Sequence, residues 1–128
     1  MLPLCDQEQI GVVSYSPLGA GFLSGKYDRG SIPKGSRFDV IPGHADIYFT
    51  GQKFAIVERL RRKSAETGYS MVRLAMGWVL KKQGITSVLV GASGLGHLEN
   101  AIEALEMDFP DEWMNEMDGW GASSKRSE

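Results

Sequence analysis

The sequence predicts an α/β protein, because it contains two strand-like segments, helices between them and a glycine-rich loop after each strand. Residues 11–15 (GVVSY) and 85–90 (ITSVLV) have the β-branched and aromatic composition of buried strands. The helical patterns between them indicate a crossover connection, which joins parallel strands, whereas a hairpin needs only a short turn. We therefore expect a buried parallel sheet that includes Val12, Val13, Val88 and Leu89, with both glycine loops at its carboxyl edge.

Composition excludes several classes of partner. The chain has 128 residues, of which 42% are hydrophobic, and 14 basic residues against 16 acidic ones give a net charge of −2. This mixed and nearly neutral charge predicts neither a nucleic-acid partner nor a membrane partner. A single cysteine, Cys5, excludes an internal disulfide, and the sequence shows no signal peptide or membrane-length apolar run, so the expected location is cytoplasmic. Cys5 is expected to be a small core residue, although a nucleophile is the alternative.

Residues 2–9 (LPLCDQEQ) precede the first strand and predict a helix or turn without an N-terminal cap. The strand ends at Ser16, because Pro17 has no N–H group to continue a ladder. A loop of small residues follows and ends in a lysine. It can hold an anion, because glycines allow close backbone approach and the other side chains offer hydroxyls and a cation. A plain surface turn is the alternative. The polar and glycine positions of the loop are Ser16, Gly19, Gly21, Ser24, Gly25 and Lys26.

A long segment, residues 28–50, shows little hydrophobic periodicity and several glycines and prolines. Irregular segments of this length are uncommon unless they have a function. Arg37 and the aromatic pair Tyr48 and Phe49 make the segment a candidate cover over a binding site. Solvated loop residues are the alternative, and both interpretations stay open.

Two amphipathic helices are expected next. Apolar residues recur at helical spacing over residues 52–66, and Gly68 is a suitable C-terminal stop. Ser70 then caps a second helix that runs to about Lys82. The arginine-rich face of the first helix is expected to be solvated, and the apolar stripe of the second is expected to be core.

The second strand also ends at small residues, at positions 91–94 (GASG), and a helix is expected to start near Leu95 or Gly96. A strand, a glycine turn and a helix N-terminus together favour anion binding, although the glycine spacing is not G-x-G-x-x-G. His97 lies on the first turn of that helix, where it contacts a phosphate or ribose or is simply exposed. A short amphipathic helix is expected over residues 110–120, before a polar tail at 121–128.

Two strands cannot complete a parallel sheet, because such a sheet needs cover on both faces and neighbours on both edges. Two β/α units with phosphate-type loops match the end of an eight-stranded β/α barrel, where the loops after strands seven and eight commonly bind phosphate. The predicted fold is therefore α/β, with residues 1–120 forming the C-terminal part of a (β/α)8 TIM barrel. The open edges are expected to be covered by a second copy of the chain or by a missing N-terminal half-barrel.

Several motifs in order resemble the C-terminal portion of an aldo/keto reductase. They are VSYSPLG at 13–19, GFLSGKY at 21–27, LAMGWVL at 74–80 and VLVGAS at 88–93. The similarity is strongest to bacterial members and to members that resemble potassium-channel β-subunits, and it extends from Leu2 to about Trp120. In that family the two glycine loops hold the phosphates of NADPH, so the resemblance implies an NADPH site here.

The resemblance assigns cofactor roles by position. Tyr15 matches the strand end under the nicotinamide, Arg37 matches an arginine of the covering segment, and His97 matches a position near the adenosine 2′-phosphate. In an ungapped match Asn100 and Ala101 fall where the family has Glu-Asn for the adenine, and a one-residue deletion would place Glu99 and Asn100 there. The remaining matched positions are Ser16, Pro17, Leu18, Gly19, Gly21, Ser24 and Lys26 in the first loop and Gly91 and Ser93 in the second.

The resemblance also implies a reaction, the reduction of a small carbonyl substrate to an alcohol by hydride transfer. The family takes its catalytic tyrosine, lysine, aspartate and histidine from the first half of the barrel, and no residue here matches them. No catalytic residue is therefore predicted, and the isolated chain is expected to be inactive. The alternative function is a non-catalytic nucleotide-binding or interaction module.

Overall fold

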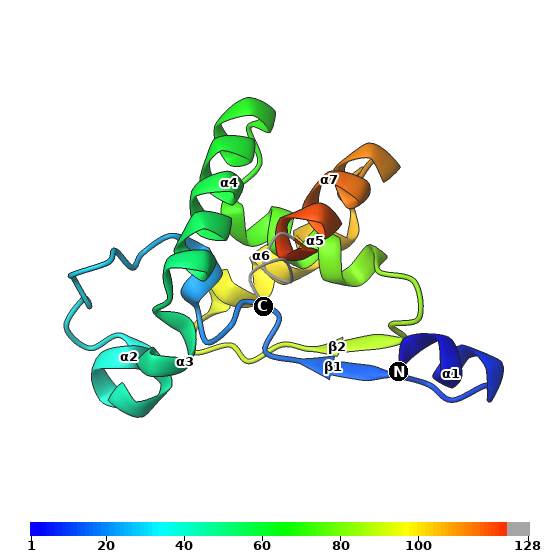
Figure 1. Ribbon diagram of the computed structural model, residues 1–128, viewed down its shortest axis with the longest axis horizontal. Coiled ribbons are helices and arrows are strands. Elements are labelled where there is room, and N and C mark those ends of the chain that lie inside the picture. Colours follow the sequence, from blue (N-terminus) through cyan, green and yellow to red (C-terminus); the bar gives the residue numbers. More distant parts are fainter. Residues whose placement is uncertain (123–128) are drawn as a thin grey trace.

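Residues 1–122 are described by the computed structural model, which shows a mixed α/β chain of mostly helices around a small parallel sheet (Figure 1). Strands β1 (Val13–Tyr15) and β2 (Ser87–Leu89) pair in parallel, with Val13 opposite Ser87 and Tyr15 opposite Leu89. Their carboxyl ends therefore lie at the same edge. This confirms the predicted crossover, and it places the two glycine loops next to each other.

The two predicted crossover helices are present with their predicted caps. Helix α4 (Gly51–Thr67) ends at Gly68, which has a left-handed φ of 78°. Helix α5 (Met71–Lys81) begins after Ser70, whose Oγ accepts a hydrogen bond from the N–H of Arg73 at 3.2 Å. These local bonds satisfy backbone groups that a helix end leaves unpaired, which is why the sequence alone located them.

The remaining elements are short except for two C-terminal helices. The segment 28–50, expected to be irregular, contains three short helical pieces, so that expectation was wrong in part. The last helix continues past the predicted boundary to include Gly121 and Ala122, and the rest of the predicted polar tail, 123–128, lies outside the described residues. The elements are α1 (Leu2–Gln7), η1 (Phe22–Ser24), α2 (Arg37–Val40), η2 (Pro42–His44), α3 (Ala45–Tyr48), α6 (Leu95–Leu105) and α7 (Asp111–Ala122).

Two apolar clusters form the core, and both are made by residues of the helices and loops and not by the strands. The first is aromatic and joins the first loop to α4, with rings such as Tyr27 and Phe38 packed edge to face at 4.7 Å between centroids. The second joins α4, α5 and α7 around Leu60, Leu74 and Phe109. The apolar stripe of α5 is therefore core, as expected.

The sheet itself is not buried, which corrects a prediction. Val13 is 55% exposed and Leu89 is 61% exposed, while Val12 and Val88 are half-buried. Side chains alternate across a strand, so the pair Ser14 and Val88 faces the helices while Val13 and Leu89 face the opposite side. Helices α4 to α7 lie on one side of the sheet in Figure 1, which leaves the other face uncovered within residues 1–122. A sequence pattern of buried strands specifies apolar side chains, but it does not specify which elements cover them.

Candidate functional site

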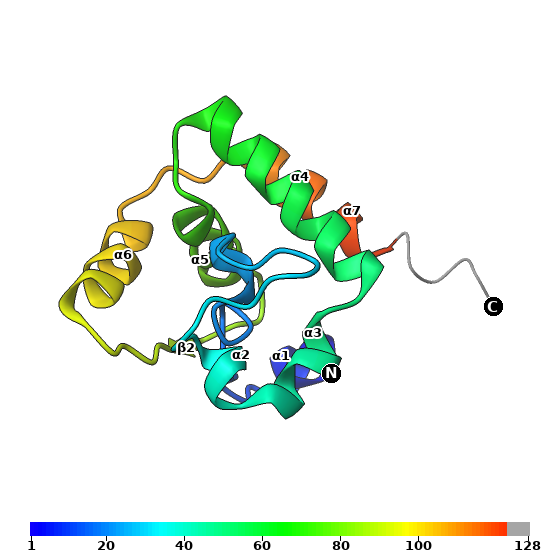
Figure 2. The same cartoon turned by 90° about the vertical axis from the view of Figure 1, so that its left-hand side faces the viewer.

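The carboxyl edge of the sheet carries both glycine loops. Tyr15 and Leu89 are paired as the last residues of their strands, so the loops leave the sheet at neighbouring positions. Helices α2 and α3 lie at this end of the molecule in two perpendicular views (Figures 1 and 2). The edge is therefore the place where the predicted site residues and the predicted covering segment meet.

The first loop is a tight turn that needs left-handed backbone. Gly19, Gly21 and Gly25 have φ of 56°, 88° and 81°, and Ser16 and Ala20 share this region at 53° and 56°. Such angles are easily reached by glycine and are strained for serine and alanine. The expectation that this loop requires glycines is confirmed.

Hydrogen bonds inside the loop use some of its polar groups and leave others available to a ligand. The Ser24 hydroxyl donates to the carbonyl of Gly21 at 2.7 Å, so it stabilises the turn and its proton is not free for an anion. By contrast, the backbone N–H groups of Ala20 and Gly21 donate no hydrogen bond to any residue that the structure describes. Two unused N–H donors in a turn of this kind suit an anionic ligand.

Lys26 supplies the positive charge of this loop. Its Nζ lies 5.2 Å from the centroid of the Tyr27 ring, and its Cε and Nζ lie 3.4 Å from the position that a Cβ on Gly21 would occupy. Within residues 1–122 its ammonium group pairs with no carboxylate. The lysine thus lies across the glycine turn with its charge available.

The covering segment is attached to the first loop through Tyr48. A Cβ on Gly19 would lie 2.8 Å from Cε1 of Tyr48, so the tyrosine ring packs directly on the glycine backbone. The same ring lies 5.8 Å from the Phe22 ring and 5.5 Å from the Phe38 ring. These contacts favour the interpretation of residues 28–50 as a cover. Arg37 is exposed at the start of α2, and its guanidinium has no partner among the described residues.

The second loop is open and leads into α6. A Cβ added at Gly91, Gly94 or Gly96 would meet no atom within 4 Å. Ser93 Oγ lies 3.3 Å from Nδ1 of His97, which places these two predicted residues together at the first turn of the helix. The first-turn N–H groups of Leu95 and Gly96 have no hydrogen-bond acceptor among residues 1–122, as is usual at a helix start.

Three predicted residues have environments that modify their expected roles. Tyr15 is 80% exposed on the uncovered face of the sheet. Leu18 is half-buried and packs against the second core cluster, so it anchors the loop. The amide of Asn100 donates to the carbonyl of Gly96 at 2.9 Å, which ties it to its own helix. Pro17 is half-buried at the turn, and Gly91 is exposed.

Sequence reasoning missed two residues that hold the first loop. Arg61 of α4 donates from Nη2 to the carbonyl of Gly25 at 3.2 Å, and Met71 of α5 packs where a Cβ on Gly25 would lie, with its sulfur at 2.6 Å. Both are distant in the chain from Gly25, and their residue types gave no signal. Within the described part of the chain, no group of three or more His, Cys, Asp or Glu side chains could hold a metal ion. None of the helices in residues 1–122 is long and apolar enough to cross a membrane.

Two parallel strands joined by a helical crossover, with a glycine loop after each strand at the same edge, define a mixed α/β protein. The chain belongs to the aldo/keto reductase family: the model for the "Aldo/keto reductase family" matches residues 1–121. The resemblance stated from the motifs is thus confirmed. Members of this family use a nicotinamide dinucleotide, NADH or NADPH.

Individual relatives include enzymes and a channel subunit. The chain is 32% identical over 123 residues to the L-glyceraldehyde 3-phosphate reductase of Escherichia coli O157:H7, covering 92% of this chain and 35% of that protein. It is 30% identical over 108 residues to a probable voltage-gated potassium channel subunit beta of Arabidopsis thaliana, covering 83% and 33%. It is 28% identical over 115 residues to the NADH-specific methylglyoxal reductase of Escherichia coli K12, covering 87% and 33%. The chain spans about a third of the length of these relatives.

Proposed function

We propose that this chain is the cofactor-binding part of an NADPH-dependent aldo/keto reductase, and that residues 1–120 form the C-terminal part of a (β/α)8 barrel. The observation that supports this most is the pairing of two glycine loops at one sheet edge, with unused backbone N–H groups in both and Lys26 unpaired. The cytoplasm is the proposed location, and a reducing compartment suits the free thiol of Cys5.

The residues at the edge fit a dinucleotide. Lys26 and the N–H groups of Ala20 and Gly21 would hold the pyrophosphate, and Arg37 would reach it from the covering segment. The open space at Gly91 and Gly94 would let a phosphate approach the first turn of α6, where Ser93 and His97 lie. Tyr15 would support the nicotinamide, which supplies the hydride when the cofactor is bound. Asn100 would have to leave its bond to Gly96 to contact the adenine.

Binding by this chain alone is expected to be weak. The second loop is exposed throughout, and the charges at the edge are accessible to water. In water, two unit charges 4 Å apart attract by only about 1 kcal/mol, and salt reduces this further. The expected affinity is therefore low and sensitive to ionic strength.

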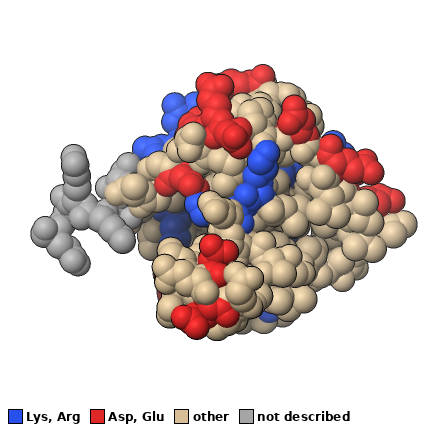
Figure 3. Space-filling model, turned by 90° about the vertical axis from the view of Figure 1, so that its right-hand side faces the viewer, with Lys and Arg blue, Asp and Glu red and all other residues tan. Residues whose placement is uncertain are grey.

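The isolated chain is proposed to lack carbonyl reductase activity. A positioned general acid that protonates the developing alkoxide contributes about 10²- to 10⁴-fold, and no residue here matches the family's catalytic acid. The substrate, a small carbonyl compound, would be bound by the whole enzyme. Figure 3 shows acidic and basic side chains together on the face that points away from the glycine loops. The mixed composition of the whole chain, with a net charge of −2, favours a small-molecule ligand over a nucleic acid.

A missing N-terminal half-barrel is the proposed partner in catalysis, and a second copy of the chain is the alternative. The uncovered face of the sheet offers Val13 and Leu89, and α6 offers exposed Leu98 and Ile102. A separate apolar groove of about 320 Å³ lies between β2 and α6, on the helix side of the sheet, and includes Leu98 and Ile102. An additional parallel strand beside β2 and its helix would cover the groove, and the rest of a half-barrel would cover Val13 and Leu89 on the other face.

The second candidate function, a non-catalytic interaction module, is favoured by the same exposed apolar surface and by the similarity to a channel β-subunit. The deciding experiment supplies a separately expressed half-barrel with the family's tyrosine, lysine, aspartate and histidine. Aldehyde-dependent NADPH oxidation is then measured with each piece alone and with both together. Activity only in the mixture supports the reductase proposal. Turnover by this chain alone would contradict it, and binding without turnover in the mixture would favour the module.

A further inference from the structure

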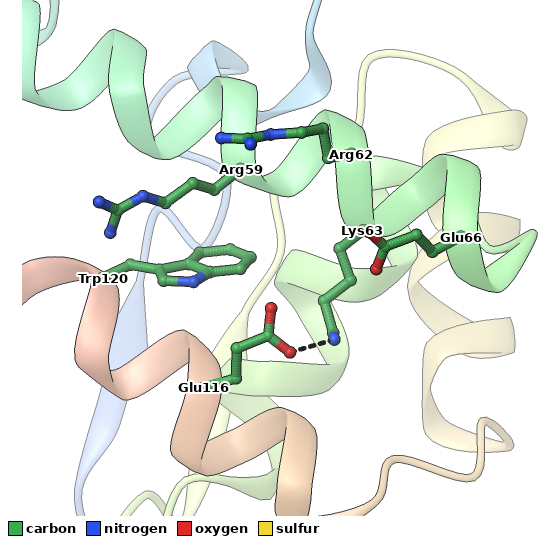
Figure 4. Close-up of a pocket in the computed structure, with 6 residues that line it drawn as sticks. All are labelled: Arg59, Arg62, Lys63, Glu66, Glu116 and Trp120. Carbon is green, nitrogen blue, oxygen red and sulfur yellow. Dashed lines mark hydrogen bonds and ion pairs between the residues drawn. The ribbon is translucent and has the colours of Figure 1, made fainter.

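A polar cavity lies between α4 and α7, formed by residues that have no role at the glycine loops. Its volume is about 280 Å³. Figure 4 shows its lining, with one wall from α4 and the other from α7. The lining residues are Arg59, Arg62, Lys63, Glu66, Glu116 and Trp120.

Of the three positively charged side chains that line this cavity, one is paired with a carboxylate and two are not, among residues 1–122. The ammonium group of Lys63 is bound by the carboxylate of Glu116 and lies 5.1 Å from the Trp113 ring centroid, so its charge is already neutralised. Arg59 and Arg62, in contrast, have no hydrogen bond or ion pair with any residue from 1 to 122. Three cations against two carboxylates leave one positive charge in excess, in a chain whose net charge is −2.

An aromatic surface lies at the cation-rich end of the cavity. In Figure 4, Arg59 and Trp120 line one end from opposite helices, while Glu66 lies beside Lys63 at the other. Trp120 is half-buried and packs against the second core cluster, which fixes its indole. The indole N–H has no acceptor among the described residues. This end therefore offers a guanidinium, a π face and a hydrogen-bond donor.

We propose that this cavity binds a small planar anion, specifically an aromatic carboxylate. A guanidinium binds a carboxylate through two parallel hydrogen bonds, and an indole stacks with another aromatic ring. The volume lies just below the lower end of the range of about 300–1,000 Å³ that is usual for small-molecule sites. The cavity is large enough for one substituted ring, and none of its lining residues belongs to a glycine loop, so this site is separate from the proposed cofactor site.

Benzoate is the probe that tests this proposal, and the indole N–H signals of the three tryptophans in a ¹⁵N-labelled chain are the readout. Benzoate should shift the Trp120 signal in a saturable manner and leave the Trp78 and Trp113 signals nearly unchanged. Benzamide, which has the ring without the charge, and cyclohexanecarboxylate, which has the charge without the ring, should each bind at least about fivefold more weakly.

Variants decide whether the named residues bind the probe. Arg59→Gln should weaken benzoate binding by about tenfold, and Arg59→Lys should weaken it less, because the charge is kept without the bidentate geometry. Arg29→Gln is the matched control, since Arg29 is an exposed arginine near Phe54 and does not line the cavity, and it should change nothing. The proposal is overturned if benzoate leaves the Trp120 signal unmoved, or if the Arg59 and Arg29 variants bind benzoate equally well.

Discussion

Replacing Gly19 with alanine tests whether the first glycine loop and its cover form one structure. Gly19 has a φ of +56°, and an added Cβ would lie 2.8 Å from Cε1 of Tyr48. The left-handed φ costs alanine about 1–2 kcal/mol, and forcing the tyrosine ring aside costs about 1–3 kcal/mol more. Alanine also restricts the unfolded chain more than glycine does, and this stabilises the folded state by about 0.4–1 kcal/mol. The free energy of unfolding should therefore fall by about 1–5 kcal/mol.

Gly35→Ala is the matched control for this prediction. Gly35 also has a left-handed φ, of +77°, but a Cβ there would meet nothing within 4 Å. The free energy of unfolding of this variant should fall by only about 0–1.6 kcal/mol, since the backbone terms act there without a clash. Urea unfolding followed by far-ultraviolet circular dichroism measures the stability of both glycine variants. Adding Tyr48→Leu to Gly19→Ala should restore part of the stability that Gly19→Ala loses, because the smaller side chain makes room for the added Cβ. Equal losses in the two glycine variants would refute the contact between Gly19 and Tyr48 as the cause.

Three further predictions follow from caps, charge and exposed surface. Ser70→Ala removes the hydrogen bond to the Arg73 N–H and should cost about 1 kcal/mol in urea unfolding; no loss would show that the cap contributes nothing. The hydrogen bond from Lys82 lowers the pKa of Asp118, with a smaller contribution from the Trp78 hydrogen bond. The ionised Asp118 carboxylate therefore stabilises the folded chain above about pH 4, and this stabilisation is lost as the pH falls through the pKa of Asp118 in the folded state. Asp118→Asn should reduce the free energy of unfolding near neutral pH by less than about 1 kcal/mol, because the carboxylate is partly exposed. If the variant and the unchanged chain lose stability equally steeply as the pH falls below about 4, this contribution of Asp118 is contradicted. Leu89→Ser, on the uncovered strand face, should reduce self-association in sedimentation measurements, and an unchanged mass distribution would exclude that face as the contact.

Elements defined by local chemistry were predictable from the sequence. Ser70 and Gly68 mark helix ends because their effects involve neighbouring backbone groups. The glycine turn after β1 was predictable because left-handed φ values favour glycine at those positions. The parallel pairing of the strands followed from the helices between them.

Features that depend on distant contacts were not predictable. The exposure of Val13 and Leu89 reflects which elements cover the sheet, and strand composition carries no information about that. The Arg61 bond to the Gly25 carbonyl joins residues 36 positions apart, and no pattern connects them. The hydroxyl of Ser24 was expected to face an anion, but it donates to the Gly21 carbonyl because that acceptor lies in the same turn.

An NMR titration of this chain with NADPH, at low and at physiological ionic strength, tests directly whether the two glycine loops bind the cofactor. Saturable shifts are expected at residues of both glycine loops, and binding should weaken as the Debye length falls from about 30 Å to about 8 Å. Lys26→Ala should weaken binding about three- to tenfold. Lys81→Ala should leave it unchanged, since Lys81 pairs with Asp111 at the end of α5. Shifts confined to other parts of the molecule, or equal effects of the two lysine variants, would contradict the assignment of this edge as the cofactor site.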